Sequence, residues 1–126
     1  MKINFWKPIT STEGAKATIH KSGKLGFSRS AQEKMQINDN TYFKIGTSEN
    51  SRDENLYLVK AQREDENSIK ASKAGDYYYL NTRVLFDELN IDYKRKKIIY
   101  DIIEVDYENI VVYKLIKREI ERKKSK

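Results

Sequence analysis

The stretch ATIHKSGKLGFSRSAQEKMQI, residues 17–37, carries the pattern that decides the fold. Apolar and polar residues alternate up to Lys21, and the alternation resumes at Leu25 after the glycine at position 23. Strict alternation predicts a half-buried strand, and a glycine between two such runs predicts a tight turn. Residues 16–21 and 25–27 are therefore expected to form a β-hairpin.

A short helix is expected directly after this hairpin. Ser30 followed by Glu33 has the spacing of a capping box, which predicts the start of a helix. Ala31 and Met35 form one apolar stripe, so the helix has about two turns before Ile37. Strand 42–45, a polar loop at 47–55 and strand 56–60 complete a predicted ββαββ unit.

The same order of elements recurs in the second half of the chain. The turn Lys21-Ser22-Gly23 falls on Lys73-Ala74-Gly75, and the helix end Met35-Gln36-Ile37 falls on Leu89-Asn90-Ile91. The predicted elements are strand 68–73, a turn at 74–75, strand 76–80, helix 82–89 with an apolar stripe of Leu85, Phe86 and Leu89, and strands 97–105 and 110–116. A repeated order of elements with few identities favours an internal duplication.

The last hairpin of the repeat is nearly continuous in isoleucine and valine. Such runs predict strands that are buried on both faces, so this hairpin is expected at the centre of the fold. Phe27, Met35, Leu89 and Ile102 occupy apolar-periodic positions and are expected to be buried.

The predicted organisation has five parts: an N-terminal arm at 1–14, a first unit at 15–61, an acidic linker at 62–67, a second unit at 68–118 and a basic tail at 119–126. A chain of 126 residues supports one compact core better than two independent ones. The two units are therefore expected to share one core.

The first unit resembles the AbrB-like family of swapped-hairpin DNA-binding proteins. Gly23-Lys24 matches the family's glycine-basic turn, Leu25 and Phe27 its returning strand, Met35 and Ile37 the end of its short helix, and residues 42–61 its last hairpin. In that family two ββαββ units, usually from two chains, close one barrel. An arrangement similar to MraZ-type tandem proteins would supply the second unit in cis. The resemblance implies a mostly β fold with short helices: tandem ββαββ units closing one pseudo-twofold swapped-hairpin β-barrel.

The resemblance implies a DNA-binding surface, and departures from the family pattern make that surface lopsided. The first helix has Gln32 and Glu33 where family members usually carry basic residues, and the second turn is Gly75-Asp76. The helix of the second unit carries Asp87 and Glu88. The first unit is therefore expected to carry most of the DNA contacts.

Charge is unevenly distributed along the chain. Residues 1–44 hold eight Lys/Arg against three Asp/Glu, and residues 117–126 hold six against two, within a total net charge of +6. This asymmetry favours a polyanionic partner. Double-stranded DNA is the expected partner, with a protein partner and self-association left open.

Lys21, Lys24, Arg29 and Lys34 are the candidate nucleic-acid-binding residues, because they surround one hairpin and the helix that it enters. Basic side chains at such places neutralise phosphates. The alternative is an ordinary solvated basic face.

Other residues have simpler alternatives. Tyr77, Tyr78 and Tyr79 can stack unpaired bases or pack with their hydroxyls on polar partners. His20 is expected to be an ordinary residue on the polar face of its strand, and residues 117–126 a frayed solubilising end with nucleic-acid contact as the second option.

The sequence points away from an enzyme. It has no cysteine, one histidine, no glycine-rich phosphate loop and no metal-ligand spacing, so neither a metal nor a cofactor is expected. No apolar run suits a signal peptide or a membrane span, which predicts a cytoplasmic protein without membrane contact. The expected function is a DNA-binding regulator or accessory protein; the alternative is a non-catalytic protein–protein interaction module that keeps the fold without DNA binding.

Overall fold

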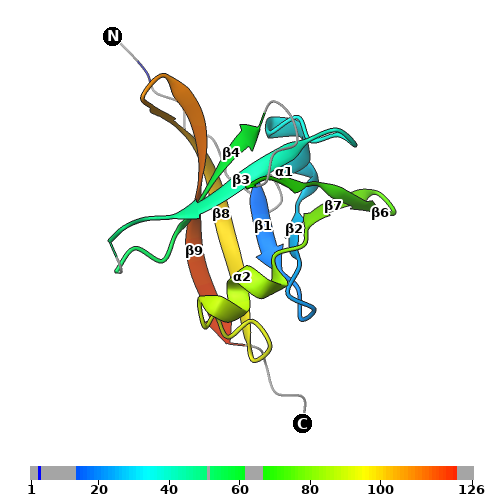
Figure 1. Cartoon of the computed structure of the whole chain (residues 1–126), viewed down its shortest axis with the longest axis vertical. Helices are drawn as coiled ribbons and strands as arrows, with labels where there is room; N and C mark the ends of the chain where they lie inside the picture. Colours follow the sequence, from blue (N-terminus) through cyan, green and yellow to red (C-terminus); the bar gives the residue numbers. More distant parts are fainter. Residues whose placement is uncertain (1–2, 4–13, 51, 62–66, 122–126) are drawn as a thin grey trace.

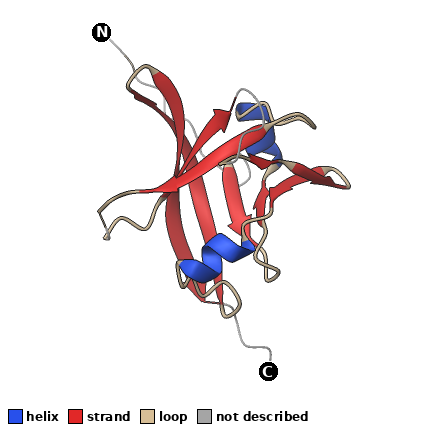
Figure 2. Cartoon of the chain, viewed as in Figure 1, coloured by secondary structure: helices blue, strands red, loops and turns tan. Residues whose placement is uncertain are grey.

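A computed structural model of the chain describes residue 3 and residues 14–50, 52–61 and 67–121. Antiparallel strands form one curved sheet, with one short helix near each end of the molecule (Figures 1 and 2). In chain order the elements are β1 (Lys16–Ile19), β2 (Leu25–Phe27), α1 (Arg29–Lys34), β3 (Tyr42–Thr47), β4 (Leu56–Ala61), β5 (Ile69–Lys70), β6 (Ser72–Ala74), β7 (Tyr77–Leu80), α2 (Arg83–Glu88), β8 (Lys96–Tyr107) and β9 (Ile110–Glu121).

The sheet nearly closes on itself. Its strand order is β5-β3-β4-β9-β8-β1-β2-β7-β6, so β5 and β6 lie at its two ends. In the chain these two strands are separated only by Ala71, whose backbone N–H donates to the carbonyl of Thr41 at 2.9 Å. One bent segment therefore supplies both edges. The expected mostly β barrel with two short helices is confirmed.

The strand pairing has a pseudo-twofold symmetry. The first strand of each unit pairs with the third strand of the other: β1 with β8, and β5 with β3. The second strands, β2 and β7, pair with each other, and so do the last strands, β4 and β9. The register repeats as well. Tyr42 on β3 pairs with Ala61 on β4. The residues 57 positions later, Ile99 on β8 and Arg118 on β9, also pair with each other. The two units therefore interlock as predicted.

Both helices end in the same local structure. Gln36 and Asn90 have left-handed backbone angles, with φ of 52° and 57°. The following residues, Ile37 and Ile91, donate their N–H groups to the carbonyl five residues earlier, at 2.9 and 3.1 Å. This arrangement is a Schellman motif, in which the apolar residue after the left-handed position packs back on the helix. The predicted equivalence of the two helix ends is confirmed.

The start of α1 differs from the prediction. Ser28, and not Ser30, caps the helix: its Oγ accepts from the N–H of Ala31 at 3.1 Å and from the N–H of Lys16 at 3.0 Å. Ser28 is the last extended residue after β2, so its side chain is the one that can reach the free N–H groups of the first turn.

The core contains three of the four residues predicted to be buried: Phe27, Met35 and Ile102. Leu89 is the exception, because 40% of it is exposed. The inward side of α2 runs through Thr82 and Phe86, which are 1% and 0% exposed. Leu89 lies past the last helical residue and on the flank of this side, at the rim of a pocket.

The β8–β9 hairpin is central in the strand order but is not buried on both faces. Only Ile98, Tyr100 and Ile102 are buried on β8, at alternate positions. The alternation arises because the strands form one curved sheet, and the core covers only its inward face. In addition, β1 pairs with β8 only from Ile98 to Asp101, and β4 pairs with β9 only from Tyr113 to Leu115. The rest of the hairpin extends beyond its neighbours as a two-stranded ribbon (Figure 1), here called the ribbon, residues 103–112. Its exposed apolar residues are Ile103, Tyr107, Ile110 and Val111.

The predicted arm at 1–14, linker at 62–67 and tail at 119–126 lie mostly outside the described residues. The start of the tail is described: β9 continues to Glu121 and so passes the predicted end of the second unit at 118.

The hydroxyl group of Tyr100 is expected to lower the free energy of unfolding, compared with a phenylalanine at the same position. The side chain is fully buried, and its hydroxyl has no hydrogen-bond partner among the described residues. Burial, followed by the nearby charges of Glu54 and Glu119, holds the pKa of Tyr100 well above its usual range. Since a buried polar group without a partner costs about 1 to 3 kcal/mol, Tyr100→Phe should raise the free energy of unfolding by about 1 kcal/mol.

Urea denaturation provides the measurement, and Tyr93→Phe is the control. The hydroxyl of Tyr93, also in a buried side chain, donates to Asp87 at 2.6 Å, so its removal should destabilise the protein by about 1 kcal/mol. Equal destabilisation by both changes would show that the Tyr100 hydroxyl has a partner.

Candidate functional site

The turn between β1 and β2 packs against the first residues of α2, which belong to the other unit. The hydroxyl of Thr82 donates to the carbonyl of Gly23 at 2.9 Å, and both residues are buried. A Cβ on Gly23 would lie 2.7 Å from the Cβ of Arg83. Lys21 and Lys24, which flank this glycine, are therefore held at the α2 end of the molecule.

Arg29 and Lys34 lie on α1, toward the opposite end of β2 (Figure 1). Arg29 lines a shallow pocket together with Glu33 and with Lys73 and Asp76 from the turn of the second unit. The predicted cluster of four basic residues is therefore split into two pairs. The interlocked topology is the reason, because each turn faces the helix of the other unit. Around Arg29 positive and negative charges are mixed.

Lys24 and His20 instead come close to Lys97, which sequence reasoning did not select. The N–H of His20, directly after β1, donates to the carbonyl of Lys24, directly before β2, at 2.9 Å. Ile19 pairs with Ile98, so His20 lies opposite Lys97 on β8. The three residues are therefore adjacent across neighbouring strands. All three lie on the outer face, because their chain neighbours Leu25, Ile19 and Ile98 point into the core. With Lys21 they form a surface that we call the turn face.

The charges of the turn face are free of acidic partners within the described part of the chain: neither Lys21 nor Lys24 nor Lys97 forms an ion pair there. On the same side of β8, Asp101 is already paired with Arg118 at 2.7 Å. The turn face can therefore attract an anion without first breaking an internal ion pair.

The three consecutive tyrosines have two different environments. Tyr78 packs against the core and its hydroxyl donates to Asp39 at 2.7 Å, as the packing explanation predicts. Tyr77, 65% exposed, and Tyr79 point to the outer face of β7. Lys24 Nζ lies 4.5 Å from the centre of the Tyr79 ring, which is cation–π distance. The outer tyrosines thus adjoin the turn face.

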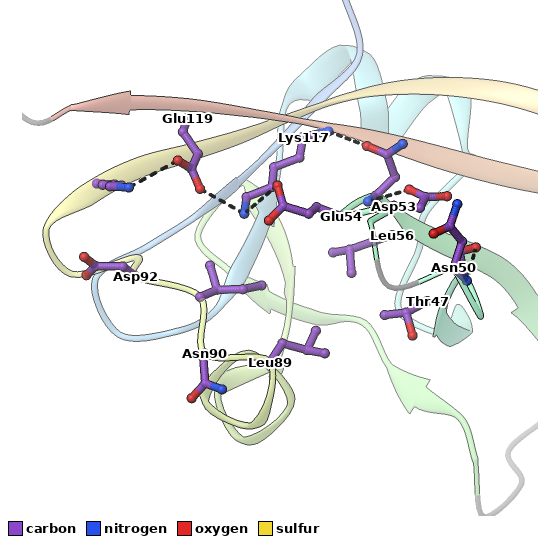
Figure 3. Close-up of a pocket in the computed structure, with 14 residues that line it drawn as sticks. Thr47, Asn50, Asp53, Glu54, Leu56, Leu89, Asn90, Asp92, Lys117 and Glu119 are labelled. Carbon is purple, nitrogen blue, oxygen red and sulfur yellow. Dashed lines mark hydrogen bonds and ion pairs between the residues drawn. The ribbon is translucent and has the colours of Figure 1, made fainter.

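A pocket of about 430 Å³ lies between the end of α2 and the loop that joins β3 to β4 (Figure 3). Inside it the side chain of Lys117 is only 10% exposed, with Nζ at 2.9 Å from Glu119 and 3.7 Å from Glu54. The hydrogen bond from Lys117 is the largest of the effects that lower the pKa of Glu119. Figure 3 shows these three side chains pointing toward one another. This network ties the loop to β9.

The sequence-based placement of Lys117 in a frayed end is therefore wrong. Lys117 lies within β9, and its backbone N–H donates to the side chain of Asn55 at 2.9 Å. Register explains the difference, because Lys117 pairs with Tyr100 and so faces inward. Charge counting along the chain cannot show this.

No group of three or more metal-binding side chains occurs among the described residues. The described helices are also too short and too polar for any of them to cross a membrane. Comparison with known proteins gives no match, whether to family models, to curated proteins or to solved structures.

Proposed function

We propose that this protein binds double-stranded DNA through the turn face and acts as a non-catalytic DNA-binding regulator or accessory protein. The observation that carries the proposal is the adjacency of Lys24, His20 and Lys97 across neighbouring strands, without an intervening acid. Strands are spaced by about 4.8 Å, so the two lysines reach phosphates roughly 10 Å apart on one backbone.

Two further features support the proposal. The basic turn at Gly23-Lys24 is one of the segments that resemble the AbrB-like DNA-binding family. The turn is also held in place by the buried hydrogen bond to Thr82, so the backbone that carries its lysines is fixed before any ligand arrives. Arg29 and Lys34 have a secondary role in this proposal, because they lie on α1, away from the turn face.

The test uses fluorescence anisotropy to measure the association constant K for a duplex of random sequence at several salt concentrations. With three to four phosphates neutralised, log K should fall with log salt at a slope of about −3 to −4. Replacing both Lys24 and Lys97 with glutamate should weaken binding to all sequences and flatten the slope by about 2.

The matched control replaces Arg29 and Lys34 with glutamate, because it makes the same change in net charge on α1. This variant should keep a slope close to that of the wild type. Equal loss in both variants would indicate attraction by net charge alone and contradict the turn face as the site. Absence of binding at low salt would contradict DNA binding itself.

One observation favours a second function, a protein–protein interaction module. The ribbon exposes Ile103, Tyr107 and Ile110, and the strand edges beside them are not paired with any described strand. Such edges accept an additional strand from a partner. The ribbon's charged residues are Glu104, Asp106 and Glu108, so the partner segment would be extended and basic. Salt-sensitive retention on a heparin column would favour DNA binding over this alternative.

A further inference from the structure

Gly26 leaves a gap in the side-chain layer on the outer face of the sheet. Its neighbours across the strands are Thr18 on β1 and Tyr79 on β7. A Cβ at Gly26 would collide with Nε2 of His20, so the imidazole ring of His20 lies over the glycine. The imidazole ring of His20 therefore fills the space above Gly26, beside Tyr79, which pairs with Gly26 on β7.

Tyr77 continues this outer face along β7. It lies two residues from Tyr79 on the same face, a spacing of about 7 Å along a strand. We call His20, Tyr77 and Tyr79 the ring platform. Lys24 borders it on one side, with its ammonium group over the Tyr79 ring.

The platform tyrosines do not serve the fold in the way that other tyrosines do. The hydroxyls of Tyr57, Tyr78 and Tyr93 donate to aspartates. By contrast, the hydroxyls of Tyr77 and Tyr79 have no hydrogen bond to any residue in the described ranges, and Tyr77 is 65% exposed. An exposed ring and a half-buried ring on one face of a sheet, next to lysines without an acidic partner, resemble the arrangement that binds nucleobases by stacking.

We infer that the ring platform binds unpaired bases of a single-stranded nucleic acid. This inference rests on the proposed nucleic-acid binding and adds a preference for regions where the duplex is open. Bases in a duplex stack on one another, so their faces are closed to a protein ring, whereas bases in a single strand are accessible. Two bases stack on Tyr77 and Tyr79, while Lys24 leaves the Tyr79 ring and joins Lys97 at the phosphates.

The experiment compares a short oligothymidylate with a random duplex of the same length by fluorescence anisotropy. Tyr77→Leu and Tyr79→Leu should each raise the Kd for the single strand by about tenfold, and should change the Kd for the duplex by less than about twofold. Tyr79→Phe keeps the ring and should bind as the wild type does. It also guards against a folding defect at this half-buried position.

Tyr107→Leu is the matched control, because Tyr107 is 60% exposed but lies on the ribbon. It should leave both affinities unchanged. Single-strand binding that survives in Tyr77→Leu and Tyr79→Leu overturns the platform; if the duplex slope still responds to Lys24 and Lys97, the proposed function stands. A wild type that binds neither probe at low salt overturns both.

Discussion

Replacing Phe86 with alanine is expected to lower the free energy of unfolding by about 3 to 5 kcal/mol, whereas the same change at Leu89 should lower it by only about 1 kcal/mol. Phe86 is fully buried on the inward side of α2, and the shortened side chain leaves a cavity that the barrel can fill only in part. Leu89 is 40% exposed, so its truncation removes less buried surface and opens no closed cavity.

Urea denaturation followed by circular dichroism measures both effects, with Val84→Ala as the baseline because Val84 is 72% exposed on the same helix. Phe86→Leu provides an intermediate variant if Phe86→Ala does not fold, and it should cost clearly more than Leu89→Ala. A loss at Leu89 as large as that at Phe86 would mean that all of the predicted stripe of Leu85, Phe86 and Leu89 packs on the core.

This contrast shows what periodicity could and could not predict. The spacing of apolar residues identified a two-turn helix after Asn81, and the helix is there. Its rotation could not be predicted, because Leu85, Phe86 and Leu89 are all apolar. The inward side contains Thr82, a polar residue whose hydroxyl donates to the carbonyl of Gly23 in the other unit. That contact crosses 59 residues of sequence.

The order of elements was predictable because its signals are local. Gly23 and Gly75 both have positive φ, at 89° and 61°. Both lie in the turns that were predicted from the alternation of apolar and polar residues on either side of them. The position of the last hairpin was also predictable, but its length and its exposure were not: strands 97–105 and 110–116 were expected, and β8 and β9 span Lys96–Tyr107 and Ile110–Glu121. Burial on both faces needs a second layer over the outer face, whereas the described strands form one curved sheet with its core on the inward side, so alternate residues of β8 stay outside.

The candidate site was predicted in part for a similar reason. Lys21 and Lys24 belong to a turn, and a turn can be placed from the sequence around it. Lys97 could not be placed beside His20 without knowing that β1 inserts next to β8 of the second unit. Arg29 and Lys34 follow Lys24 closely in sequence, yet the length of β2 carries them away from the turn.

The second large effect is expected at that turn, where Gly23→Ala should destabilise the protein by about 2 to 5 kcal/mol. At a φ of 89° any L side chain is strained, and the new methyl group would lie 2.7 Å from Arg83 Cβ and 3.0 Å from Arg83 Cα. Because one of these atoms is backbone, the start of α2 must shift. That shift also loosens the buried hydrogen bond between Thr82 and Gly23.

Gly75→Ala is the matched control, because Gly75 occupies the equivalent turn with a φ of 61° and no atom within 4 Å of an added Cβ. Only the backbone strain of about 1 to 2 kcal/mol applies there. The difference between the two variants in chemical denaturation thus measures the contact between the first turn and α2. Equal losses would show that the turn is not held by α2, and the lysines of the turn face would then lack the fixed position on which the DNA-binding proposal depends.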